Sequence, residues 1–189
     1  FGINVMKSIV VEVEASDGTI GVSTGQGGAP ACYMIEQHFR RFIVGLDPRD
    51  INKAWDQMYR SSMYYGGKGL PMWAISVVDL ALWDLLGQLR HEPVYKMIGG
   101  AVRDEIELYC TGIRPDIAKD AGFIGGKMPL PFAPVERDKG LKANVEHFQQ
   151  MRNKVGPDFW LMADCWMSLD VPYAVELANA MREVDLYWI

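Results

Sequence analysis

The chain has 189 residues, 49% of them hydrophobic and 23% charged, which is ordinary for a soluble globular protein of one large or two small domains. Its net charge of −5, without a basic cluster, argues against nucleic acid or an anionic membrane as the main partner. No apolar run reaches the ~20 residues of a membrane span, and no signal pattern follows the first residue. The three cysteines lack CxxC spacing, so we expect a reduced, cytoplasmic protein.

The first part of the chain predicts a β-hairpin followed by helices. Apolar and polar residues alternate from Lys7 to Ala15, a Ser-Asp-Gly turn follows, and Thr19–Thr24 returns as the second strand. Asp47-Pro48 is expected to cap the second of three helices. These helices are expected over Ala31–Ile43, Ile51–Ser62 and Met72–Leu89. The third is apolar nearly all round, which is typical of a helix buried between layers.

After Gly100 the pattern changes to strands that alternate with helices, which predicts a parallel sheet. The expected strands are Glu105–Thr111, Phe123–Lys127, Phe159–Asp164 and the start of a fourth at Leu186–Ile189. Helical segments are expected over Pro115–Ala121, over Leu141–Val155 and from Asp170 to Val184. Since this amounts to about three and a half βα units, we expect the chain to be a fragment of a longer protein.

Two charged residues close successive strands of this predicted sheet. The apolar run from Phe159 ends in Asp164, and a buried charge must be paired or coordinate a metal. Lys127 follows Gly125-Gly126, which allow backbone or a ligand to approach closely. Both side chains would face the same mouth, where they could serve proton transfer and metal binding. Taken alone, Asp164 could simply cap a loop or helix and Lys127 could be a surface lysine, and magnesium needs more than one carboxylate.

No catalytic triad can be assembled from the remaining residue types. His38 and His147 lie in predicted helices and His91 in a turn, so we expect all three to be structural. Cys110 and Cys165 have no nearby histidine in the pattern, and we expect buried, unreactive thiols.

Several motifs, in order, resemble the mandelate racemase branch of the enolase superfamily. Ala81–Gly87 (ALWDLLG), Pro93 and Ile98-Gly99-Gly100 resemble the buried helix and glycine turn that join its two domains. Asp164 in LMADCWMSLDVPYA resembles the third-strand metal ligand, and Tyr187-Trp188-Ile189 the approach to the second ligand. The segments GFIGGKMP, GAVRDEI and FWLMADCWMS are most similar to members of this branch that dehydrate L-rhamnonate.

The resemblance implies an α+β capping domain, residues 1–104, followed by the first part of a modified (β/α) TIM-type barrel, residues 105–189, with both incomplete. It implies Mg2+ held by three carboxylates on strand tips, one of them Asp164. A base would abstract the proton α to the substrate carboxylate, and the metal would stabilise the enediolate. Elimination of the β-hydroxyl would then convert L-rhamnonate to 2-keto-3-deoxy-L-rhamnonate. A homo-oligomer, possibly an octamer, is also implied.

The positions at which this sequence departs from the family pattern restrict which reactions and which catalytic base are expected. Racemases and cycloisomerases of this type carry Lys-x-Lys on the second strand, where this chain has Lys127 and then Pro129, which cannot act as a base. The resemblance therefore implies that the base is a histidine late in the barrel, beyond Ile189. It also implies that Lys127 lies near the substrate carboxylate or the enediolate. Trp166 replaces a polar residue that follows the ligand in many relatives. The Tyr64–Gly69 loop resembles a capping loop.

From these matches the expected substrate-binding residues are Trp166, Tyr65 and Lys68. Two alternatives stay open: dehydration of another sugar acid, such as a related aldonate or fuconate, and a non-catalytic barrel scaffold. The scaffold is the weaker reading, because Asp164 and Lys127 are costly to keep at a dry strand tip without use. The 189 residues alone are expected to be inactive, with one of three ligands and no base.

Overall fold

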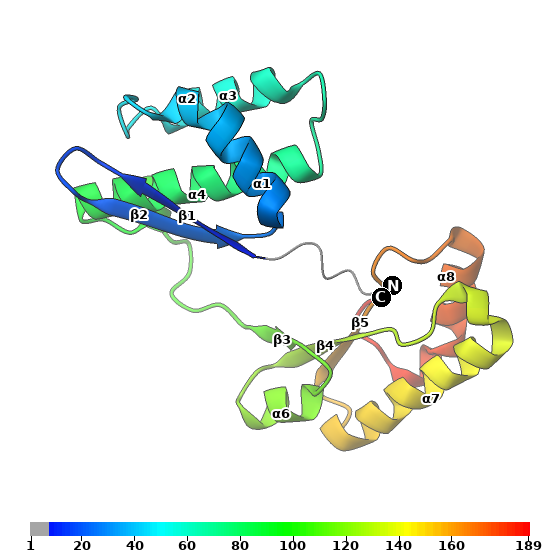
Figure 1. Ribbon diagram of the computed structural model, residues 1–189. Coiled ribbons are helices and arrows are strands. Elements are labelled where there is room, and N and C mark those ends of the chain that lie inside the picture. Colours follow the sequence, from blue (N-terminus) through cyan, green and yellow to red (C-terminus); the bar gives the residue numbers. More distant parts are fainter. Residues whose placement is uncertain (1–7) are drawn as a thin grey trace. The chain divides into compact units, whose positions relative to one another are not determined.

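The computed structural model describes residues 8–189, which divide into two compact units (Figure 1). The N-terminal unit ends at Val102 and the C-terminal unit is Arg103–Ile189. Lys7, at which the first predicted strand begins, lies outside the described residues.

In the N-terminal unit a two-stranded antiparallel sheet packs on a long helix (Figure 1). Strand β1, Ile9–Glu14, pairs with β2, Ile20–Gly25, and helix α4 is Leu70–Arg90. A Cβ at Gly21 would overlap the carbonyl oxygen of Ala81 and the backbone nitrogen of Leu85. The absence of a side chain at Gly21 therefore lets strand and helix touch.

Side chains of α4 also satisfy backbone groups of β2. Asp84 Oδ2 accepts the N–H of Val22 at 2.8 Å, and Gln88 Nε2 donates to the carbonyl oxygen of Ile20 at 2.8 Å. The aspartate of the ALWDLLG motif thus has a structural role, since it accepts a hydrogen bond from the backbone of β2.

Replacing Gly21 by alanine is expected to lower the free energy of unfolding by about 2 kcal/mol, because the added methyl group meets backbone that cannot rotate away. Urea unfolding of the purified variant measures the change. Gly112→Ala is the matched control: its Cβ meets nothing within 4 Å, and we expect a change within about 0.5 kcal/mol. Equal stability of the two variants would contradict the close contact at Gly21.

Three further helical stretches complete the N-terminal core. Helix α1, Gly28–Met34, continues without a break through a π-helical turn η1, Ile35–Phe39, into α2, Arg40–Ile43. The helix predicted from Ala31 thus starts earlier and contains a π turn. Helix α3 is Ile51–Ser62 and the short α5 is Val94–Met97. The buried apolar side chains of the unit's main cluster are Ile9, Ala31, Phe39, Ile51, Ala54, Met58, Ala74, Ile75, Val77, Val78, Leu82 and Leu86.

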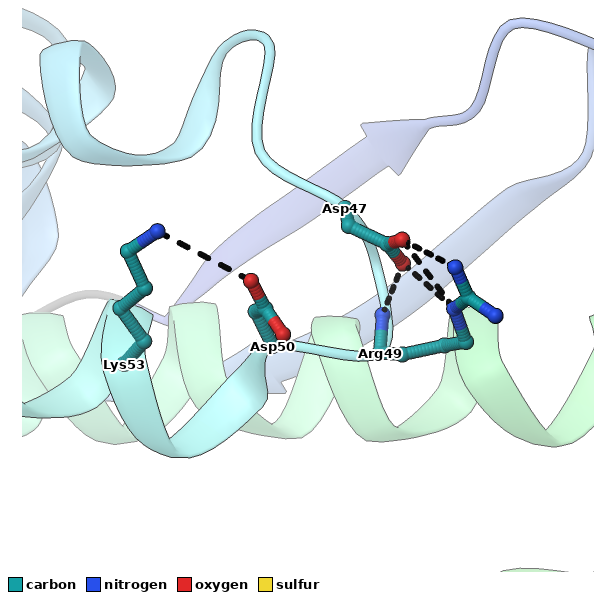
Figure 2. A network of polar contacts seen from close by, with 4 residues as sticks. All are labelled: Asp47, Arg49, Asp50 and Lys53. Carbon is teal, nitrogen blue, oxygen red and sulfur yellow. Dashed lines mark hydrogen bonds and ion pairs between the residues drawn. The ribbon is translucent and has the colours of Figure 1, made fainter.

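The predicted cap of α3 is wrong. Asp50, not Asp47, precedes the helix, and it makes no capping hydrogen bond. Asp47 instead accepts the backbone N–H of Arg49 at 2.9 Å and pairs with the Arg49 guanidinium (Figure 2). The hydrogen bonds from the Arg49 side chain and backbone lower the pKa of Asp47 to about 2. Asp47 and Arg49 thus form a separate turn before the helix, and Pro48 lies in that turn rather than in the first turn of α3.

Helix α4 is long and apolar enough to cross a membrane by length and composition alone, yet more than half of its most apolar stretch is buried inside the unit. It is the core helix that the sequence predicts. The expectation of burial all round is corrected at Leu80 and Trp73, which are 54% and 39% exposed.

The C-terminal unit is a parallel sheet in the order β3-β4-β5 with helices between the strands (Figure 1). Strand β3 is Tyr109–Thr111, β4 is Gly125–Pro129 and β5 is Trp160–Asp164. The fourth strand predicted at Leu186–Ile189 is not formed as such: Trp188 makes an isolated parallel bridge to Met162, and the N–H of Ala163 donates to the carbonyl oxygen of Trp188 at 3.2 Å. The helices are α6, Pro115–Asp120, α7, Arg137–Val155, and α8, Val171–Ala180, with 3-10 turns η2, Pro134–Glu136, and η3, Arg182–Val184.

The largest differences from the predicted strands are in β3 and β4, which both start later than expected, while β5 starts one residue later, at Trp160. Glu105–Leu108 is not part of β3, because its parallel partner begins only at Gly125, which lies opposite Tyr109. Strand β4 runs on to Pro129, since that residue lies opposite Asp164 in the pairing with β5. Lys127 therefore lies in the middle of its strand and not at its end. Asp170 does cap α8, as predicted, by accepting the N–H of Tyr173 at 2.8 Å.

Candidate functional site

Lys127 and Asp164 project from the same face of the parallel sheet. Lys127 lies opposite Met162 and Pro129 opposite Asp164, and side chains two apart along a strand share a face. The other face carries Leu161 and Ala163, which pack into the buried cluster beneath the helices. The alternation thus directs apolar residues toward the helices and leaves the charged pair on the opposite face.

The two glycines before Lys127 are explained by packing on both faces of β4. A Cβ at Gly125 would lie 2.8 Å from Met162 Cε, and one at Gly126 would lie 2.7 Å from Pro115 Cβ. The close approach predicted from Gly125-Gly126 is therefore made by the protein's own side chains and backbone. This packing determines the position of β4 relative to β5 and α6, and therefore the position of the Lys127 side chain.

A short ion pair joins the two strands. Lys127 Nζ lies 2.8 Å from Asp164 Oδ2, with the side chains 19% and 31% exposed. The hydrogen bond from Lys127, followed by one from the backbone N–H of Trp166 to Oδ1 at 3.1 Å, lowers the pKa of Asp164. The same contact raises the pKa of Lys127. At neutral pH the site therefore contains a carboxylate anion and an ammonium cation, which compensate each other's partial burial.

The chain turns sharply after Asp164 through two strained residues. Trp166 and Met167 have φ of 51° and 54°, the left-handed region that non-glycine residues rarely adopt. Both side chains are exposed, and Ser168 closes the turn by donating its N–H to the carbonyl oxygen of Cys165 at 2.9 Å. Such strain costs about 1–3 kcal/mol per residue and clusters at functional sites. The sequence carries no glycine there that could have revealed the turn.

Asp164 suits one position in a magnesium site, because it is an ionised oxygen ligand, partly exposed at a strand tip. Within residues 8–189 it is not joined by two further acidic, histidine or cysteine side chains that could complete a metal site. The described residues thus fit one ligand of such a site, with Lys127 as the cation that pairs with the carboxylate here.

The other expected site residues lie in the N-terminal unit. Tyr65 and Lys68 belong to the loop between α3 and α4, where Lys68 is exposed and Tyr65 Oη lies 2.6 Å from His38 Nδ1. The structure thus brings together Lys127, Asp164 and Trp166, while substrate contact by Tyr65 and Lys68 stays a prediction. Burial, and then the charge of Asp164, raises the pKa of Cys165, in keeping with an unreactive thiol.

Comparison with known proteins gives two family matches, one for each part of the chain. Residues 3–99 match the mandelate racemase / muconate lactonizing enzyme N-terminal domain, and residues 113–189 match the enolase C-terminal domain-like family. The predicted fold class, a capping domain with part of a barrel, is confirmed by these matches.

Among curated proteins, an L-rhamnonate dehydratase of Saccharopolyspora erythraea is 56% identical over all 189 residues, which cover 48% of that relative. Among solved structures, L-rhamnonate dehydratase from Gibberella zeae is 55% identical with a TM-score of 0.94 over 99% of this chain and 48% of that one. The same comparison with the Gibberella zeae enzyme complexed with Mg gives a TM-score of 0.94, at 55% identity, over 99% of this chain and 46% of that one. This chain spans about half the length of these relatives.

Proposed function

The chain belongs to the mandelate racemase / muconate lactonizing enzyme family of the enolase superfamily, and on that premise we propose that it forms part of a Mg2+-dependent sugar-acid dehydratase. The proposed reaction converts L-rhamnonate to 2-keto-3-deoxy-L-rhamnonate. One observation carries the proposal: the ionised Asp164 ends β5 beside Lys127, in a chain 56% identical to an L-rhamnonate dehydratase.

In this proposal Asp164 is one of the magnesium ligands. Mg2+, when bound, supplies positive charge beside the substrate carboxylate and so favours loss of the neighbouring proton. The other ligands are proposed to come from the part of the barrel that lies outside this sequence, since magnesium needs an octahedron of oxygens.

Lys127 is proposed to act as a cation and hydrogen-bond donor toward the substrate carboxylate or the enediolate. In this structure the hydrogen bond to Asp164 raises its pKa, which favours a protonated donor over a free base. Pro129, two residues later, has no side chain that could remove the proton from carbon. We therefore propose that the base is a histidine elsewhere in the complete barrel, and that loss of the β-hydroxyl follows proton removal.

The surroundings of the site are proposed on the same premise. Trp166, next to the metal ligand and exposed, would contact the substrate, as would Tyr65 and Lys68 from a capping domain of residues 1–104. The barrel part would be residues 105–189. We further propose a cytoplasmic homo-oligomer, possibly an octamer, in which the free Cys32, Cys110 and Cys165 stay reduced.

Dehydration of L-rhamnonate by the full-length protein is expected to need Mg2+. In a panel of L-rhamnonate, L-fuconate and other aldonates, we expect kcat/KM for L-rhamnonate to exceed that for the others by about tenfold or more. Formation of the 2-keto acid is measured directly, and EDTA is expected to abolish it until Mg2+ is restored. Preference for another aldonate would change the proposed substrate but leave the proposed dehydration reaction unchanged. Absence of turnover for every acid, with Mg2+ present, would favour the scaffold instead.

A further inference from the structure

One side-chain hydrogen bond ties the loop between α3 and α4 to the π-helical turn η1. Tyr65 Oη, in the loop, lies 2.6 Å from His38 Nδ1, in the turn. In the part of the chain that the structure describes, no other side chain of residues 63–69 makes a hydrogen bond or an ion pair. The contact joins residues 27 positions apart in the sequence, so it anchors the loop to a different element.

Apart from this contact, hydrogen bonds hold the loop only at its two ends. Tyr65 and Gly66 donate their N–H groups to the carbonyl oxygen of Ser62 at 3.1 and 2.9 Å, and Gly69 accepts from Trp73 at 3.1 Å. Between these ends the sequence is Gly-Gly-Lys, which has little intrinsic preference for one conformation. Segments with few buried contacts open at little free-energy cost, so a single anchor has a large influence here.

The π turn sets His38 in place for this contact. Phe39 of the same turn is fully buried, which fixes the rotation of the segment. The His38 ring lies 5.2 Å from that of Phe39, 6.1 Å from that of Phe42 and 5.7 Å from that of Tyr65. Its Nε2 is buried without a partner among residues 8–189, so Tyr65 is the one polar partner of the ring there. π turns occur often at functional sites.

The protonation states agree with a neutral hydrogen bond. Burial lowers the pKa of His38, and the positive charge of Arg41 in the following turn lowers it further. Burial also raises the pKa of Tyr65, the titratable group that faces His38 from the loop. At neutral pH the phenol therefore keeps its proton and can donate it to an uncharged imidazole nitrogen.

We propose that His38 is a positioning residue, which holds the loop of residues 63–69 in place through Tyr65 and thereby fixes where Lys68 is presented. The hydrogen bond and its effect on the loop stand on the geometry alone. That Lys68 is presented to a substrate rests on the proposed function.

The anchoring is tested by trypsin cleavage after Lys68 in the full-length protein. Tyr65→Phe removes only the hydroxyl group, and His38→Phe replaces the imidazole by an aromatic ring without a nitrogen acceptor. Each is expected to speed cleavage about fivefold. The double variant is expected to match the single variants, because both remove the same interaction. His38→Asn, whose amide can replace Nδ1, is expected to restore most of the protection.

Tyr64→Phe is the matched control, because Tyr64 is fully exposed and lies next to Tyr65. It is expected to be cleaved at the wild-type rate. Cleavage of His38→Phe and Tyr65→Phe at the wild-type rate would overturn the anchoring, and so would additive effects in the double variant.

The link to substrate is tested by kinetics with L-rhamnonate and Mg2+. We expect His38→Phe, which leaves the Tyr65 side chain intact, to raise KM about threefold to tenfold with kcat retained, since it loosens the loop that presents Lys68. Faster cleavage with an unchanged KM would overturn the presentation of Lys68 to substrate. A wild-type protein that dehydrates no sugar acid would contradict the proposed function, and the cleavage rates would still decide on the hydrogen bond.

Discussion

Asp164→Asn in the full-length protein is expected to lower kcat for L-rhamnonate by about 10³-fold or more and to weaken Mg2+ binding. The amide is nearly the size of the carboxylate but carries no charge, so it is a poor ligand for a hard cation. It also leaves Lys127, 2.8 Å from Oδ2 in the native protein, without its anionic partner. Metal titration by calorimetry and initial rates at saturating Mg2+ separate the loss of binding from the loss of turnover.

Lys127→Met is the control for this experiment, because it removes the other half of the same ion pair. It leaves the carboxylate of Asp164 in place, so Mg2+ affinity is expected to be kept or increased while kcat/KM falls by about 10²-fold. Equal loss of Mg2+ affinity in both variants would show that the ion pair only supports the fold. Full activity and Mg2+ affinity in Asp164→Asn would contradict the proposed metal site.

That Lys127 and Asp164 face the same side of the sheet could be predicted from topology, although Lys127 lies in the middle of β4 and the ion pair itself was not predicted. Alternating strands and helices predict a parallel sheet, and the ends of neighbouring parallel strands lie together. The exact register could not be predicted, since it depends on contacts distant in sequence. Strand β4 is placed by Met162 and Pro115 against Gly125 and Gly126, and this shifted its bounds from those expected.

Other features escaped prediction because the residues involved have no special preference for the conformation they adopt. Trp166 and Met167 are held in the left-handed region by the turn after β5, although neither is a glycine. The π turn at Ile35–Phe39, in which Phe39 is buried, was not visible in the helical pattern. Asp47 looked like a helix cap because Pro48 follows it, but Arg49 provides a nearer donor.

The position of β5, and with it that of Asp164, depends on a buried arginine. Arg152 of α7 is 8% exposed and donates to backbone carbonyl oxygens on both sides of the strand's start. Nε reaches Val184 at 2.9 Å, one terminal nitrogen reaches Gly156 and Phe159 at 2.7 Å each, and the other reaches Asp185 at 2.7 Å. The guanidinium thus ties together the end of α7, the entry to β5 and the end of the 3-10 turn η3.

Arg152→Met is accordingly expected to lower the free energy of unfolding by about 3–4 kcal/mol, since about four buried hydrogen bonds are worth about 1 kcal/mol each. The methionine keeps the length and much of the apolar stem but leaves these carbonyl oxygens without donors. Urea unfolding followed by tryptophan fluorescence measures the change. Lys154→Met, in the same helix turn but exposed, is expected to change stability by less than about 0.5 kcal/mol. A loss no larger for Arg152→Met than for Lys154→Met would mean that water replaces the guanidinium, and that β5 is held by its apolar contacts alone.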